Sequence, residues 1–288
     1  MGRKKEVKVA PSGPIMRLLD WALLSHLRAI DEEYVKPGAT TDGRVLTVVY
    51  VSCMVLFLLN YLVLSHDYQV WAARLLIDTL GIWGPVTGDS LQTLEPWKVS
   101  LTMRISWSLG CMFFYLVIPG IVHLFLLKRP LTGLGLSPRG FFKHLWIYAL
   151  LFLPVAGCVW VVSYQEAFQK TYPFYRYPDS IQSLLLWEAF YALQFFSLEV
   201  FFRGFMLNEL KHKWGWRAVL FMMTPYCMIH FSKPGLEALG AIIAGSVLGI
   251  LALRTKNIWG GVTIHVAVAW SMDFASLLQR DWFDKMKW

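Results

Sequence analysis

The sequence carries little charge for its length. Asp, Glu, Lys and Arg make up 16% of its 288 residues, whereas 56% are hydrophobic. A soluble domain has roughly a quarter of its residues charged. The composition therefore excludes an ordinary soluble domain and predicts a protein that spans a membrane several times.

Cysteine is also scarce, and phosphate-binding glycine motifs are lacking. The four cysteines lie in apolar segments without CxxC spacing, which argues against a disulfide framework and for buried small side chains. The net charge of +8 does not indicate a nucleic-acid partner, because no Gly-rich phosphate loop or base-stacking motif accompanies it. The basic residues flank apolar segments instead, where they orient a chain in the bilayer and meet anionic lipid.

Long apolar segments dominate what is present. Several approach the roughly 20 residues that an α-helix needs to cross about 30 Å of hydrocarbon. We predict an all-α polytopic membrane protein, a bundle of seven to eight transmembrane helices, the eighth being the short segment 68–84. The other spans are expected near 45–65, 103–127, 144–164, 187–209, 215–232, 236–253 and 257–276.

The N-terminal region precedes this bundle as a separate unit. We assign residues 1–43 to a basic cytoplasmic arm with an amphipathic helix, and residues 44–288 to the transmembrane domain. Residues 14–30 place apolar side chains on most of one helical face. That pattern predicts either an interfacial helix lying on the membrane or a helix packed on the protein itself.

The distribution of Lys and Arg predicts the orientation. With a cytoplasmic N-terminus, the inside segments are more basic than the outside loops, as the positive-inside rule requires. We expect a multi-pass protein of the cell (inner) membrane. The inside segments hold Arg3, Lys4, Lys5, Lys8, Lys128, Arg129, Arg139, Lys143, Lys211, Lys213, Arg217, Arg254 and Lys256.

Polar residues inside the predicted spans point to a site. Glu199 and Arg203 lie four residues apart, so they share one helix face and could simply neutralise each other. Two further helices each bring a histidine, His230 and His265. If the three helices meet at a wet cavity, the glutamate can activate water and an imidazole N–H can stabilise an oxyanion. The same Glu199, His230 and His265 also match a His2Glu zinc site, so the metal-free and zinc alternatives both stand.

Three stretches resemble a known family. EVFFRG, YCMIH and HVAVA, together with LTGLGLSPRGFF upstream, are similar to the motifs of the CPBP family of intramembrane proteases, the CAAX proteases and bacteriocin-processing enzymes. The resemblance covers about residues 183–275. It implies an all-α bundle and an endopeptidase that cuts a membrane-embedded or lipidated substrate at the bilayer. It also implies that Glu199 lies on the general-base helix with Arg203 as its partner, that His230 is a site histidine and that His265 is the oxyanion donor.

The sequence departs from that pattern at two positions. The family has a glutamate where this chain has Leu198, and an Asn or similar residue where it has Ala269. Tyr226, Glu237 and Asp273 are candidate supporting residues. From the resemblance we expect an intramembrane endopeptidase in which a glutamate activates water. The alternatives are an inactive scaffold or self-immunity protein of the same fold, or a proton-coupled carrier.

Overall fold

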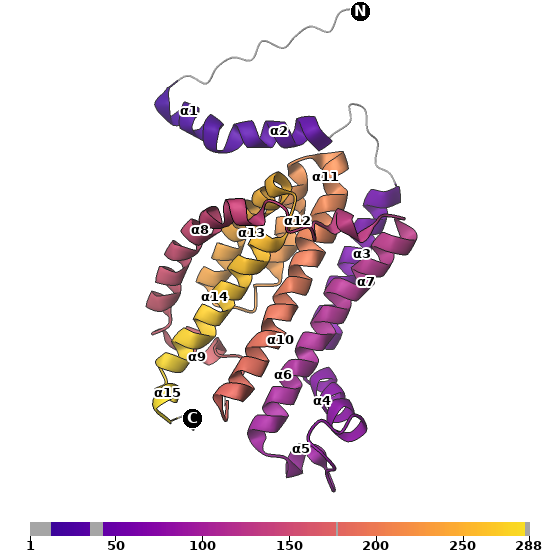
Figure 1. Ribbon diagram of the computed structural model, residues 1–288, viewed down its shortest axis with the longest axis vertical. Helices are drawn as coiled ribbons and strands as arrows, with labels where there is room; N and C mark the ends of the chain where they lie inside the picture. The colour runs from indigo at the N-terminus through magenta and orange to yellow at the C-terminus, as the bar shows by residue number, and fades with distance from the viewer. Residues whose placement is uncertain (1–12, 35–42, 177, 286–288) are drawn as a thin grey trace, which may run out of the picture.

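The computed structural model describes residues 13–34, 43–176 and 178–285, and every regular element in these ranges is a helix (Figure 1). Six of the described helices are long and apolar enough to cross a membrane. The predicted all-α polytopic membrane fold is thus confirmed. The six are α3–η2 (Gly43–Val63), α6–η5 (Pro96–Leu126), α8 (Phe141–Val162), α10–α11 (Ile181–Trp214), α13 (Gly235–Thr255) and α14 (Trp259–Leu278).

Two expected spans are shorter than the sequence suggested. The apolar run 215–232 contains α12, which covers only Arg217–Met228, about 18 Å at 1.5 Å per residue. Pro225 lies inside α12, and irregular turns follow it up to Pro234. The segment 68–84 falls on α4 (His66–Arg74) and η3 (Leu75–Thr79), followed by turns. Within the described residues, the expected seven to eight spans are therefore six spans plus these short helices.

The helix that carries Glu199 runs through the centre of the bundle. It comprises α10 (Ile181–Glu199), the π-helical η7 (Val200–Leu207) and α11 (Asn208–Trp214) without a break. Half of the residues in its most apolar 18-residue stretch are buried, which is the largest share among the six candidate spans. All residues of η7 are buried, and the wide π-turn begins directly after Glu199. Such turns occur frequently at functional sites.

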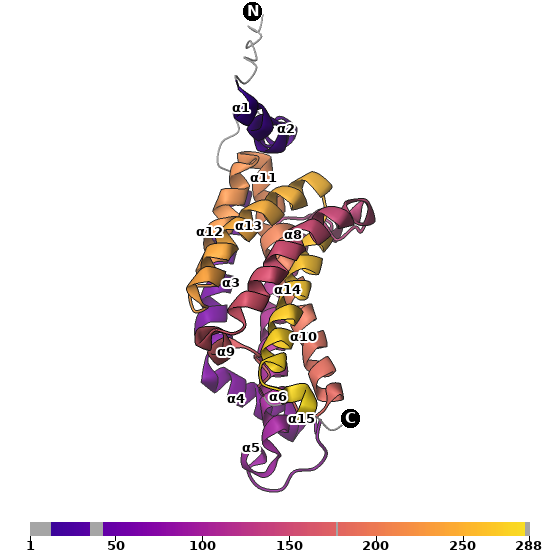
Figure 2. The same cartoon turned by 90° about the vertical axis from the view of Figure 1, so that its left-hand side faces the viewer.

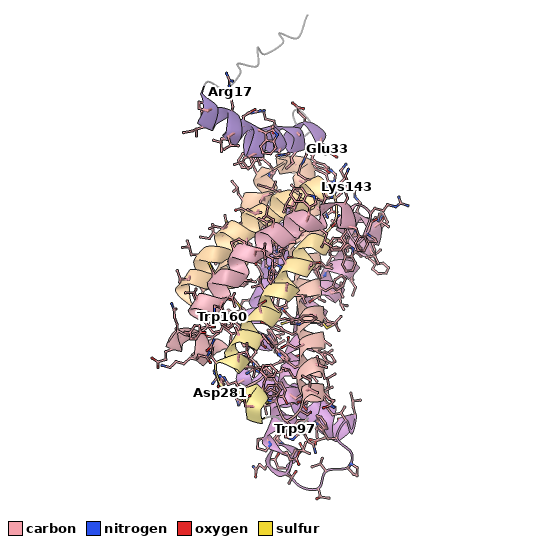
Figure 3. All side chains as sticks on the ribbon, turned by 60° about the vertical axis from the view of Figure 1, so that its left-hand side comes forward. Arg17, Glu33, Trp97, Lys143, Trp160 and Asp281 are labelled. Atoms are coloured by element: carbon pink, nitrogen blue, oxygen red, sulfur yellow. The ribbon has the colours of Figure 1, made fainter. Side chains whose placement is uncertain are left out.

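The N-terminal helix lies crosswise over one end of the bundle (Figures 1 and 2). It consists of α1 (Pro14–Leu19), η1 (Asp20–Leu24) and α2 (Ser25–Tyr34). Figure 3 places Arg17 and Glu33 on this helix, Lys143 at the same end of the bundle, and Trp97 and Asp281 at the opposite end. Residues 1–12 and 35–42 of the basic arm lie outside the described residues.

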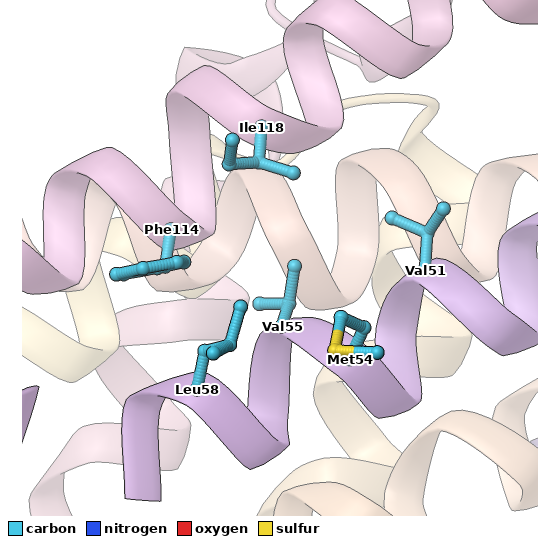
Figure 4. A pocket seen from close by; sticks show the side chains of 6 residues that line it. All are labelled: Val51, Met54, Val55, Leu58, Phe114 and Ile118. Atoms are coloured by element: carbon cyan, nitrogen blue, oxygen red, sulfur yellow. The ribbon is translucent and has the colours of Figure 1, made fainter. Parts of the chain in front are cut away.

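The outer faces of the bundle are apolar, as lipid contact requires. A shallow apolar cleft of about 130 Å³ opens between α3 and the helix η4–α7 (Phe113–Ile121), as Figure 4 shows. None of its lining residues is polar, so the cleft has no means to perform acid–base chemistry. Its lining residues are Val51, Met54, Val55, Leu58, Phe114 and Ile118.

The remaining short elements lie between the long helices or after the last one. They are α5 (Ser90–Thr93), the 3-10 turn η6 (Leu131–Leu134), α9 (Glu166–Thr171) and α15 (Trp282–Lys285).

Candidate functional site

The buried carboxylate of Glu199 is the centre of the polar group inside the bundle. Its side chain is 0% exposed, and Oε1 lies 3.0 Å from Arg203 Nη1. The same Oε1 lies 2.6 Å from Nδ1 of His265 on α14. A buried carboxylate is tolerated only when it is paired and held by polar neighbours, and here two neighbours do so. The predicted convergence of Glu199, Arg203 and His265 is present in the structure.

Arg203 is as deeply buried as its partner, at 1% exposure. Its guanidinium lies 4.4 Å from the ring centroid of Tyr226, a cation–π contact that attracts the charge to a residue of α12. The ion pair predicted from the four-residue spacing therefore exists. It forms part of a larger group instead of standing alone.

His265 uses both ring nitrogens. Nδ1 faces Glu199, and Nε2 lies 2.6 Å from the Tyr226 hydroxyl. Beside Arg203 the carboxylate acts as an acceptor, so Nδ1 carries the proton and Nε2 accepts the hydroxyl proton of Tyr226. The ring also stacks on that of Phe195, with 5.6 Å between the ring centroids and an interplanar angle of 3°. This environment holds His265 in one orientation and one tautomer.

His230 joins the group through Tyr226 and not through Glu199. Its Nδ1 lies 2.8 Å from the Tyr226 carbonyl oxygen, and the two rings are 4.9 Å apart. A carbonyl oxygen can only accept, so Nδ1 carries the proton of the neutral ring. Nε2 then presents a lone pair on a half-buried side chain. In this tautomer His230 is a proton acceptor.

Two glycines at the start of α14 make room for the site, and the sequence analysis did not single them out. A Cβ on Gly261 would lie 2.2 Å from Glu199 Oε2, and one on Gly260 would lie 1.8 Å from the ring of Tyr148. Only glycine allows these close approaches. The adjacent glycines in WGG, just ahead of a helix with a site histidine, were the available signal.

The other two acids named as supporting residues do not contact Glu199. Both oxygens of Glu237 accept from the Tyr172 hydroxyl at 2.8 Å, and Asp273 Oδ2 accepts from Trp187 Nε1 at 3.0 Å. The first contact ties the segment after α9 to α13, and the second ties α10 to α14. Of the three supporting candidates, the structure places only Tyr226 in the site.

The residues present do not fit the zinc alternative. Both nitrogens of His265 already have partners, and Nδ1 of His230 points to a carbonyl. A catalytic zinc site needs three protein ligands aimed at one point, and a structural site needs four. No group of at least three His, Cys, Asp or Glu side chains suited to a metal occurs in the part of the chain that the structure covers.

The two departures from the family pattern are apolar in their surroundings as well. Leu198 is buried in the main hydrophobic core, and Ala269 packs in a second core cluster with Trp187 and Tyr191. Neither place supplies a polar substitute for the missing acid or amide.

The fold and this buried group define a polytopic helical membrane protein with an acid–base cluster between α10, α12 and α14. The family model "Type II CAAX prenyl endopeptidase Rce1-like" matches residues 180–271, about a third of the chain, and these residues include the whole cluster. The resemblance to the CPBP intramembrane proteases is therefore confirmed over this segment. No curated protein and no solved structure was found to match.

Proposed function

We propose that the protein is a CAAX-type intramembrane endopeptidase that hydrolyses a peptide bond in a membrane-embedded or lipidated substrate. The family match supports the reaction class. The observation that carries the proposal is the gathering of polar groups around Tyr226. Its hydroxyl contacts His265, which contacts Glu199 and through it Arg203, and its backbone carbonyl contacts His230. The carbonyl contact fixes the tautomer and the orientation of His230, as hydrolytic sites require of a base.

The geometry favours His230 as the general base instead of Glu199. Glu199 is fully buried and already contacts two partners, whereas His230 is half-buried with an available lone pair on Nε2. Water loses a proton to Nε2 as its oxygen attacks the carbonyl carbon. The resulting imidazolium then gives that proton to the leaving amine as the C–N bond breaks, which restores the neutral ring. Glu199, through His265, positions Tyr226.

The proposed reaction needs no metal. The arrangement supports this, since Glu199 Oε1 faces Nδ1 of His265 while Nδ1 of His230 faces a backbone carbonyl. We also propose that the protein lies in the cell membrane with its N-terminus in the cytoplasm. Support comes from Lys143, which lies at the same end of the bundle as the N-terminal helix (Figure 3).

A peptide-cleavage assay tests the proposal. Purified protein in detergent is incubated with prenylated, tail-labelled peptides, and His230→Gln is compared with wild type. We expect a loss of 10²-fold or more, on the order of a general base. His144→Gln is the matched control, because His144 Nδ1 also lies 2.8 Å from the carbonyl four residues earlier, outside the site. Full cleavage by His230→Gln would refute the assignment.

The buried Leu198 and Ala269 favour a second candidate, a non-catalytic protein of the same fold. Such a protein would bind the substrate without cutting it. Wild-type protein that retains labelled prenylated peptide on a size-exclusion column, yet releases no fragment, would support this second function. Measured turnover by wild-type protein, lost in His230→Gln, would exclude it.

A further inference from the structure

The N-terminal helix has two halves with opposite surroundings. From Leu23 onward its residues are largely half-buried, and Ile30, at 1% exposure, belongs to the main core. Glu33 forms an ion pair with Lys256 at 2.5 Å, and Tyr34 packs edge-on against His212. This half is docked on α11 and on the end of α13.

The N-terminal half of this helix is exposed. Ile15 is 80% exposed and Trp21 is 74% exposed, and large apolar side chains lie between them. The polar residues of this stretch, Arg17 and Asp20, lie to one side of the helix by their spacing. Asp20 is held by Arg28 from two turns away. The exposed apolar residues are Ile15, Met16, Leu18, Leu19 and Trp21.

The position of this helix indicates what covers the apolar stretch. The helix runs crosswise to the bundle, so it lies parallel to the plane of a membrane that the bundle crosses (Figures 1 and 2). The Glu33–Lys256 pair places it directly beside the end of α13, a candidate span, where the hydrocarbon gives way to headgroups. The sequence also places Arg3, Lys4, Lys5 and Lys8 before this helix, a charge suited to an anionic surface.

We propose that the segment Ile15–Trp21 binds the anionic lipid surface of the protein's own bilayer. Its apolar residues enter the boundary between headgroups and acyl chains, and Arg17 meets lipid phosphates. The docked half, through Ile30 and Glu33, holds the segment at that level. This proposal is independent of whether the protein cleaves peptides.

Site-specific lipid quenching tests the proposal. The full chain, with its four cysteines replaced, is labelled with an environment-sensitive fluorophore at Leu18→Cys or at the control Arg17→Cys. Each variant is placed singly into nanodiscs of phosphatidylcholine alone or mixed with phosphatidylglycerol, with brominated acyl chains as quencher. We expect a blue shift and strong quenching at position 18, weak quenching at position 17, and a larger difference with anionic lipid.

Three outcomes would overturn the proposal. They are equal quenching at positions 17 and 18, no quenching at position 18, and quenching that is the same with and without anionic lipid. Because each disc holds one chain, contact with a second copy cannot imitate the expected result. A second variant, Ile15→Glu with Leu18→Glu, leaves the docked half unchanged. In that background, a label at Trp21→Cys should lose its lipid quenching while the protein elutes as wild type does.

Discussion

The hydroxyl of Tyr226 lies 2.6 Å from Nε2 of His265, and the carbonyl of the same tyrosine lies 2.8 Å from Nδ1 of His230. One residue of α12 thus connects the two histidines that the sequence places on separate helices. Its hydroxyl joins it to the buried pair of Glu199 and His265, and its backbone carbonyl orients the half-buried His230.

Replacing Tyr226 by Phe should separate positioning from folding. The variant leaves His265 Nε2 without its donor, which costs about 1–3 kcal/mol for a buried group. We expect cleavage to fall about tenfold or more while the protein still folds, because the ring and its contact with Arg203 remain. Thermal unfolding and kcat/KM report the two effects. Tyr115→Phe, a buried tyrosine of the same core, is the control; equal losses in both variants would contradict the role of Tyr226.

Gly261→Ala tests the close approach of α14 to Glu199. The added Cβ would lie 2.2 Å from Oε2, so the carboxylate or the helix must move. We expect a loss of about 1–3 kcal/mol in unfolding free energy and a matching loss of activity. Gly240→Ala on α13, where a Cβ would meet no described atom within 4 Å, should cause no loss and should stabilise the helix by up to about 1 kcal/mol. If Gly261→Ala were as stable as wild type, α14 would not pack tightly against the Glu199 carboxylate.

Leu198→Glu restores the acid of the family pattern at a position that the structure buries. Leu198 belongs to the main apolar core, and an acid there lacks a partner. We expect the variant to lose at least about 2 kcal/mol of stability, while Leu198→Met loses under about 1.5 kcal/mol. Thermal unfolding in detergent measures the stability of both variants. A stable Leu198→Glu protein that cleaves faster than wild type would instead show that water reaches this position.

The docking of the N-terminal helix should depend on pH through Glu33. The Lys256 ammonium beside it lowers the pKa of the Glu33 carboxyl below its ordinary value. A carboxyl with a depressed pKa in the folded state contributes stability above its ordinary pKa and loses it as the pH falls through the lowered one. Because both side chains are largely exposed, the contribution is at most about 1 kcal/mol.

Hydrogen exchange of α2 at decreasing pH measures this loss. Protection should fall in wild type as Glu33 is protonated. A Glu33→Gln variant should be less protected at neutral pH and should show no fall from this position. Identical pH profiles for the two proteins would contradict a role for the ion pair.

Much of the fold could be predicted because it follows from local chemistry. Apolar segments of sufficient length must form helices in lipid, since each backbone N–H and C=O needs an internal partner. The i, i+4 relation of Glu199 and Arg203 likewise follows from helix geometry alone. The same reasoning failed for 215–232, where Pro225 and the turns before Pro234 shorten α12 although the composition stays apolar.

The site was less predictable, because its members come from different helices. Neither the tautomers of His230 and His265 nor the separation of Glu237 and Asp273 from Glu199 can be read from spacing. Gly260 and Gly261 also read as ordinary packing residues until Tyr148 and Glu199 are seen against them.

The sequence by itself determined that this chain is a helical membrane protein with one acidic and two imidazole side chains in apolar surroundings, because hydrophobic length and motif order are properties of the linear chain. Only the tertiary structure decided that Glu199 is enclosed by Arg203 and His265, and that Nδ1 of His230 faces the Tyr226 carbonyl. The direction in which each helix turns its polar face depends on packing against its neighbours, and no local interaction specifies it.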